Sequence, residues 1–137
     1  MKATELMVGD WVCLKDDTKC EFPLKVDGVL TDDISLEGEG FLGGVDGLIR
    51  PIPLTPEILD KNGWERDIDK EWEYNNSHIL PHYCYQWEKQ NVKIEMYAGL
   101  EGFTISLIIG RRFYAVHELQ HVLRLYGLDE LADNFKI

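Results

Sequence analysis

The residues from Tyr83 to Ile109 constrain the fold most, because apolar and polar side chains alternate there in three separate runs. A period of two places successive side chains on opposite faces of a β-strand. Only a few residues separate the runs, and connections that short join antiparallel neighbours. The apolar positions are Tyr83, Tyr85, Trp87, Val92, Ile94, Met96, Phe103, Ile105 and Leu107. The segment therefore predicts a three-stranded antiparallel meander with one apolar face that needs a cover.

A second periodic segment runs from about Ala115 to Tyr126 and repeats with the period of an α-helix. Gly127 follows it, and glycine readily adopts the left-handed conformation that ends helices. The residues on its apolar stripe are Val116, Leu119, Val122, Leu123 and Tyr126. The pattern predicts a C-terminal helix, and we expect its apolar stripe to cover the meander.

The first fifty residues contain short apolar runs separated by Asp and Gly clusters. The runs are Trp11–Leu14, Phe22–Val29, Ile34–Leu36 and Leu48–Ile49. Such spacing predicts a small β-rich unit, which we interpret as a candidate SH3-like barrel.

The boundary between the two halves lies near Pro51 and Pro53, because proline favours an extended chain. Thr55 before Pro56 is a helix start signal, so we expect a short helix over 56–61 that Gly63 ends. Residues 67–76 alternate aromatic and charged side chains and predict a half-buried strand. We divide the chain into a β-rich subdomain, 1–54, and an α+β subdomain, 55–137.

Charge and composition limit the classes of partner. The formal net charge is −11, from 25 acidic and 14 basic residues. This acidity argues against binding to nucleic acid or to an anionic membrane surface, because both would be repelled at long range. No segment has the roughly 18 apolar residues of a membrane span. Three cysteines, Cys13, Cys20 and Cys84, without a CxxC pair indicate free thiols and a cytoplasmic protein.

One motif suggests catalysis, namely the string from His117 to His121 with Glu118 between the histidines. Histidines four residues apart on a helix can bind one Zn²⁺, with the glutamate as general base for a bound water. A catalytic zinc needs a third protein ligand, and the extended metalloprotease motif has Gly and His where this chain has Arg124 and Gly127. The remaining carboxylate candidates are Asp129, Glu130 and Asp133. We therefore keep a zinc hydrolase as an alternative only.

Another pair with the same spacing, His78 and His82, contains Pro81, which opposes helical geometry. A structural metal site formed by these two histidines with His117 and His121 is an alternative that we rank below the hydrolase, because histidines in a loop before a strand are more common.

The helix face opposite the apolar stripe is polar and suggests a surface for a protein partner. It carries His117, Gln120, His121 and Arg124. An arginine between two imidazoles opposes a divalent cation, which favours partner binding over metal binding on this face.

Three stretches of the chain resemble a family of small bacterial proteins of unknown function that occur among prophage and mobile-element genes. The stretches are Met1–Val12, Ile49–Trp64 and Tyr114–Gly127. In that family the third stretch reads Val-His-Gln-Leu-Gln-Asn-Leu, which Val116, His117, Leu119 and Gln120 match and from which Glu118 and His121 depart. The resemblance implies no activity, ligand or catalytic residue.

Taken together, the sequence predicts an α+β fold and, as function, a non-enzymatic interaction or accessory protein of a phage or mobile element, with an unidentified protein partner and no cofactor. Two alternatives stay open. One is the zinc-dependent hydrolase with His117, Glu118 and His121, and the other is an acidic nucleic-acid mimic, which requires carboxylates gathered on one face.

Overall fold

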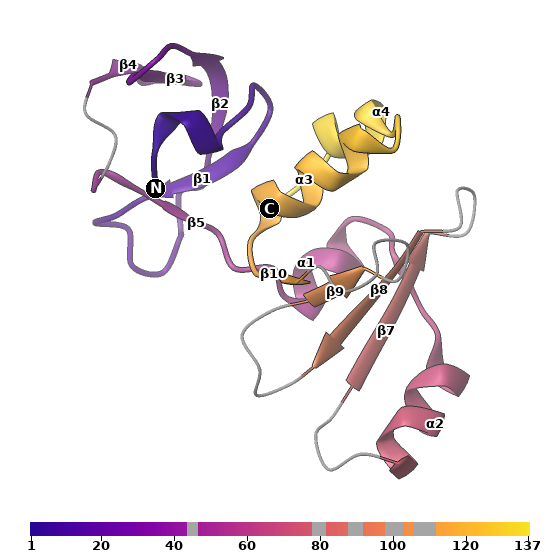
Figure 1. The fold of residues 1–137 in the computed structure, drawn as a ribbon. Coiled ribbons are helices and arrows are strands. Elements are labelled where there is room, and N and C mark those ends of the chain that lie inside the picture. Colours follow the sequence, from indigo (N-terminus) through magenta and orange to yellow (C-terminus); the bar gives the residue numbers. More distant parts are fainter. Residues whose placement is uncertain (44–46, 78–81, 88–91, 98–102, 106–111) are drawn as a thin grey trace. The chain divides into compact units, whose positions relative to one another are not determined.

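The computed structural model describes residues 1–43, 47–77, 82–87, 92–97, 103–105 and 112–137 (Figure 1). Contacts group the chain into two compact units. The first contains Met1–Pro53 together with Ala115–Phe135 and Ile137, and the second contains Leu54–Tyr114 and Lys136. The division by sequence placed residues 115–137 with the second unit, whereas by contacts almost all of them group with the first.

The first unit contains a five-stranded antiparallel sheet in the order β4-β3-β2-β1-β5. The strands are β1 (Trp11–Leu14), β2 (Leu24–Val29), β3 (Ile34–Leu36), β4 (Gly40–Leu42) and β5 (Ile49–Pro51). A short 3₁₀ turn, η1 (Ala3–Glu5), precedes them. Four strands match the predicted runs, and β4 was missed because it has only three residues among glycines. No pairing joins β4 to β5 within the described residues, so this sheet is open and no closed barrel is formed.

One face of this sheet forms the core of the first unit with residues of η1. The buried residues of this core are Ala3, Leu6, Val12, Val26, Ile34, Leu36 and Ile49. The same unit contains α3 (Val116–Leu125) and α4 (Asp129–Asp133), and α3 agrees with the predicted C-terminal helix. Gly127 follows it at φ +75, the left-handed conformation expected after a helix end. The predicted cover of the meander by this helix stays a prediction.

The second unit contains a sheet in the order β10-β9-β8-β7-β6. Its strands are β6 (Glu65–Arg66), β7 (His82–Trp87), β8 (Val92–Tyr97), β9 (Phe103–Ile105) and β10 (Arg112–Phe113). Tyr85 pairs with Ile94, and Ile94 with Ile105, both antiparallel. The predicted meander is confirmed for these residues, and Leu107 lies outside the described part of the chain. The α+β class is confirmed by the two antiparallel sheets and the C-terminal helices.

Two helices complete the second unit. The helix α1 (Pro56–Lys61) has the predicted bounds, and the Thr55 side chain accepts a hydrogen bond from the Ile58 amide at its start. The strand predicted over 67–76 is wrong, because the chain forms α2 (Ile68–Ser77) there. At the start of this helix, Asp67 accepts a hydrogen bond from the Lys70 amide, and the buried Glu71 forms an ion pair with Arg66. These contacts stabilise a helix, although the alternation of aromatic and charged residues around Trp72 is typical of a strand.

The loop between β1 and β2 contains a second correction. Cys13 and Cys20 form a disulfide, so the prediction of three free thiols is wrong, and Cys84 is the free cysteine. The odd number of cysteines suggested free thiols, but it does not exclude one local disulfide with the third cysteine left free. The seven-residue separation lets Cys13 and Cys20 close a short loop between β1 and β2. No helix among the described residues is long and apolar enough to cross a membrane.

Candidate functional site

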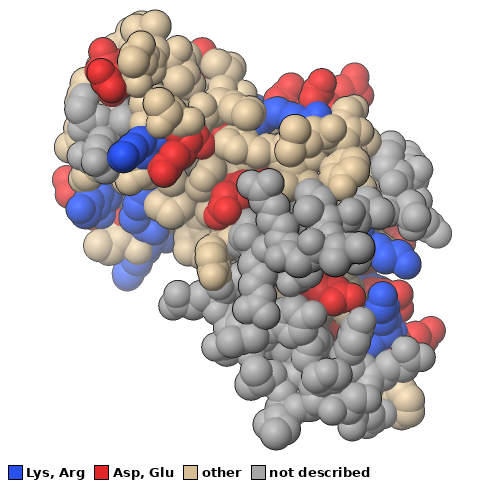
Figure 2. All heavy atoms as spheres, in the orientation of Figure 1, with Lys and Arg blue, Asp and Glu red and all other residues tan. Residues whose placement is uncertain are grey.

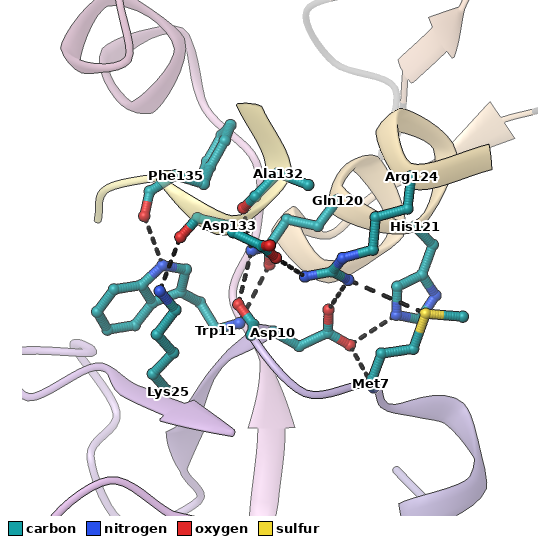
Figure 3. Close-up of polar contacts among 11 residues, drawn as sticks. Met7, Asp10, Trp11, Lys25, Gln120, His121, Arg124, Ala132, Asp133 and Phe135 are labelled. Atoms are coloured by element: carbon teal, nitrogen blue, oxygen red, sulfur yellow. Dashed lines mark hydrogen bonds and ion pairs between the residues drawn. The ribbon is translucent and has the colours of Figure 1, made fainter. Parts of the chain in front are cut away.

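The polar face of α3 contacts the loop that precedes β1, and Asp10 lies at the centre of these contacts (Figure 3). The Asp10 carboxylate is fully buried. Its Oδ2 accepts the Met7 amide at 2.8 Å and lies 2.6 Å from Nε2 of His121. Its Oδ1 accepts Nη1 of Arg124 at 2.7 Å. These three partners compensate for removing a carboxylate from water, which makes the cluster a structural anchor for the helix.

Gln120 fastens the same helix face at a second point. Its side chain is fully buried, and its Nε2 donates to the carbonyls of Gly9 and Ala132, both at 2.9 Å. Its Oε1 accepts the Trp11 amide at 3.1 Å. The amide group therefore joins three segments, namely the loop before β1, the helix α3 and the helix α4, without leaving either polar atom unsatisfied.

The start of β1 and the adjacent strand β2 also hold the end of α4. The indole Nε1 of Trp11 donates to the Phe135 carbonyl at 2.7 Å, and Nζ of Lys25 donates to the Asp133 carbonyl at 2.7 Å. The Lys25 ammonium lies 5.8 Å from the centre of the Trp11 ring, within reach of a cation–π interaction. The Asp133 carbonyl is one of the C-terminal carbonyls that a helix leaves without an intrahelical donor, and the Phe135 carbonyl lies two residues beyond the end of α4.

The four residues of the predicted partner face thus contact this chain itself. His117 and Gln120 are buried, and His121 and Arg124 bind Asp10. The polar groups of Gln120, His121 and Arg124 are therefore engaged within the chain. Asp10 itself was missed by sequence reasoning. A single aspartate before a strand is an ordinary turn residue, and it was marked only by its place in the stretch Met1–Val12 that carries the family resemblance.

The three residues of the hydrolase alternative have separate structural roles. Glu118 reaches back to the start of α3, where its Oε1 accepts the Ala115 amide at 3.2 Å. The rings of His117 and His121 lie 5.6 Å apart at 79°, and Nε2 of His121 faces Asp10. Of the residues that the structure describes, the one group of three metal-ligating side chains is Cys13, Asp17 and Cys20. His78 and the side chain of His82 lie outside the described part of the chain.

His117 is a buried histidine with an unsatisfied nitrogen. Its exposed fraction is 8%, and its Nδ1 has no hydrogen-bond partner among the residues that the structure describes. Burial lowers the pKa of the imidazole below its ordinary value of 6.5, although the Asp10 carboxylate opposes this shift and His121 adds to it. The ring is therefore neutral at neutral pH and serves as a packed side chain of α3.

The outer face of the first sheet exposes two large apolar side chains. Phe41 on β4 is 63% exposed, and Leu30 at the end of β2 is 56% exposed. Ser35 pairs with both Gly28 and Phe41. A side chain built on Gly28 would lie 3.8 Å from Cζ of Phe41, so the ring leans over this glycine. Leu30 directly follows β2, and its amide donates to the Asp33 carbonyl at 2.8 Å, so the hairpin pairing continues to this residue. Strand alternation then assigns Leu30 to the same face as Gly28.

The second unit contains a small cavity between α2, β7 and β8, lined in part by Lys70, Cys84 and Glu95. It offers about 10 Å³, which is room for one water. Small-molecule sites have volumes of roughly 300 to 1,000 Å³. This cavity is therefore too small for a substrate or cofactor.

Comparison with known proteins gave no match: no protein-family model, curated protein or solved structure is similar to the chain.

Proposed function

We propose that this protein is a non-enzymatic interaction protein and that the outer face of β2, β3 and β4 binds an apolar, basic segment of a partner protein. The observation that carries the proposal is the exposure of Phe41 and Leu30 beside Gly28 on one sheet face. Aromatic side chains are common anchors at interfaces, because a rigid ring buries a large area at low entropic cost. Gly28 has no side chain, which lets the Phe41 ring lie close to the sheet on this face.

The charge of this segment supports a basic partner. Residues 25–43 contain five acidic residues and one lysine, Lys25. The acidic residues are Asp27, Asp32, Asp33, Glu37 and Glu39. Carboxylates around an apolar centre attract cationic side chains and repel acidic competitors. The bound segment therefore carries Lys or Arg beside an aliphatic or aromatic side chain.

The two other functions have weaker support. A hydrolase needs Glu118 free to accept a proton and His121 free to bind metal, whereas Glu118 caps α3 and His121 binds Asp10. A nucleic-acid mimic needs carboxylates gathered on one face. On the face drawn in Figure 2, Lys and Arg side chains lie among the Asp and Glu side chains of the described residues. Both observations favour an interaction protein.

The finer fold that we propose for the first unit is an SH3-like arrangement. Its support is the strand order, in which β1 to β4 form a meander and β5 returns to pair with β1. The resemblance to proteins of prophages and mobile elements adds a proposed context, in which the partner is another protein of such an element. Fold alone does not imply function, so the binding surface carries the proposal.

Selection of a randomised peptide library on the immobilised protein tests the proposed surface. We expect enriched peptides with Lys or Arg next to Leu, Ile or Phe, and weaker binding as the salt concentration rises. Phe41→Ser and Leu30→Ser should each weaken the selected peptides by roughly tenfold or more, the effect of losing about 1.4 kcal/mol of contact.

Leu125→Ser is the matched control, because Leu125 is 74% exposed and belongs to α3, not to β2, β3 or β4. It should leave peptide binding unchanged. Enriched peptides that bind Phe41→Ser and Leu30→Ser as well as the unchanged protein, or a library that yields no enrichment, would contradict the proposal.

A further inference from the structure

The loop between β1 and β2 brings three metal-ligating side chains together. One ligand atom from each of Cys13, Asp17 and Cys20 lies within 4.8 Å of the other two. Cys13 is fully buried on β1, and Cys20 and Asp17 are half-buried in the loop. The two sulfur atoms form the disulfide described above, and the carboxylate lies beside it.

Bonds other than the disulfide hold the carboxylate in place. The Asp17 side chain accepts the amides of Glu21 at 2.9 Å and Phe22 at 2.8 Å. These two bonds fix the orientation of the carboxylate beside the two sulfur atoms. The Cys20 amide donates to the Asp17 carbonyl at 3.1 Å, and Cys20 has a left-handed φ of 52. Backbone hydrogen bonds therefore hold Asp17 and Cys20 in addition to the sulfur–sulfur bond.

We propose that, after reduction of the disulfide, Cys13, Cys20 and Asp17 bind one thiophilic divalent cation of the Zn²⁺ class. Two thiolates and one carboxylate are a ligand set that Zn²⁺ accepts, and a water molecule fills the fourth tetrahedral position. The site requires no Lewis base other than these three side chains and water.

The charge of the reduced site matches a dication. Two thiolates and the Asp17 carboxylate give −3, and the nearby Arg50 guanidinium, which donates to the Asp17 carbonyl, adds +1. The sum of −2 is neutralised by one divalent cation.

Metal binding at this loop takes two steps, reduction of the disulfide and then exchange of the thiol protons for the cation. Two thiols of a low-molecular-weight reductant supply two electrons and two protons to the disulfide and leave as their own disulfide. The cation then displaces the two thiol protons to solvent, and two metal–sulfur bonds and one metal–oxygen bond form. The disulfide and the metal complex exclude each other, because both use the same sulfur atoms. The loop is therefore a redox-dependent metal site.

Cobalt titration of the full chain, reduced and then freed of reductant under anaerobic conditions, tests this site. We expect one Co²⁺ per chain with thiolate-to-cobalt absorption that Zn²⁺ abolishes by displacement. Cys20→Ser should halve that absorption, and Asp17→Asn should weaken binding by more than roughly tenfold, the lower end of the cost of changing even an outer-shell partner. Circular dichroism of each variant monitors its folding.

Two variants and one oxidation state serve as controls. Cys84→Ser removes the free cysteine of the other unit, and Asp16→Asn removes the neighbouring carboxylate, so both should bind Co²⁺ as the unchanged chain does. The oxidised chain should bind none. Binding by the oxidised chain, undiminished thiolate absorption in Cys20→Ser, or no binding by the reduced and folded chain would overturn the proposal. The test is independent of the peptide-binding function.

Discussion

The buried side-chain amide of Gln120 forms hydrogen bonds with three backbone groups. Gln120→Leu keeps the volume but leaves the Trp11 amide and the carbonyls of Gly9 and Ala132 without a partner. We expect the free energy of unfolding to fall by about 3 kcal/mol. Urea denaturation measures this change. Leu125→Ala on the exposed side of the same helix should change the stability by less than about 0.5 kcal/mol.

His117 is expected to make stability depend on pH. Its folded pKa lies below its unfolded value, so the unfolded chain binds the proton more readily in mild acid. The stability that the neutral ring contributes is therefore present above the unfolded value of 6.5 and is lost as the pH falls below it. His117→Gln should lose less stability than the unchanged chain between about pH 7.5 and about pH 5.5 in urea titrations. An equal or larger loss in the variant would contradict this assignment.

The attachment of α3 to the loop before β1 depends on Asp10. Asp10→Asn removes the charge that pairs with His121 and Arg124 and should lower the free energy of unfolding by about 3 kcal/mol. Asp133→Asn is the matched control, because Asp133 also binds Arg124 but its side chain is 57% exposed. That change should cost less than about 0.5 kcal/mol. Similar losses in the two variants would show that burial does not set the strength of these pairs.

The helix α2 is attached to its sheet through the buried carboxylate of Glu71. Its two oxygens accept Nε of Arg66 at 3.1 Å and Nη2 at 2.8 Å, and Oε1 also accepts the Cys84 amide at 2.9 Å. Glu71→Gln exchanges an acceptor for a donor that faces the Arg66 guanidinium. We expect a loss of about 2 kcal/mol in thermal or urea unfolding. Glu65→Gln, at an exposed position of β6, should have little effect.

Elements with a strong local signal were predictable from sequence. Thr55 and Pro56 marked the start of α1, and the stripe from Val116 to Leu123 marked α3. The helix α2 was missed because Trp72 and Tyr74 alternate with charges as strand residues do. What makes it helical is the pairing of Glu71 with Arg66 and Cys84, and the partner 13 residues away on β7 has no signature in the local sequence.

Contacts between distant parts of the chain were the least predictable. The motif around His117 and His121 was visible, but the partner of His121 is Asp10, 111 residues earlier. One sequence offers 25 acidic residues as candidates for that role and no pattern that selects one of them. The pairing is decided by packing of the whole first unit, which is why the motif suggested chemistry and the structure shows an anchor.

Alkylation of the cysteines measures whether the whole molecule is folded and whether the disulfide is present. Burial raises the pKa of the Cys84 thiol to about 11, so very little thiolate exists at neutral pH. We expect no adduct when the chain, purified without reductant, is treated with an alkylating reagent in its native state. Unfolding in urea without reductant should give one adduct by mass spectrometry. A native adduct would contradict the burial of Cys84, and three adducts after unfolding would contradict the disulfide.

The two main stretches of the first unit, Met1–Pro53 and Ala115–Phe135, are separated in the sequence by residues 54–114 of the second unit. During synthesis, Asp10 leaves the ribosome 111 residues before His121. At a typical elongation rate this interval lasts roughly 10 s. Throughout that time a carboxylate destined for complete burial remains in water, and the second unit is already available to fold. The stretch that ends at Pro53 is therefore made before the second unit but is completed only after residues 115–135 have followed.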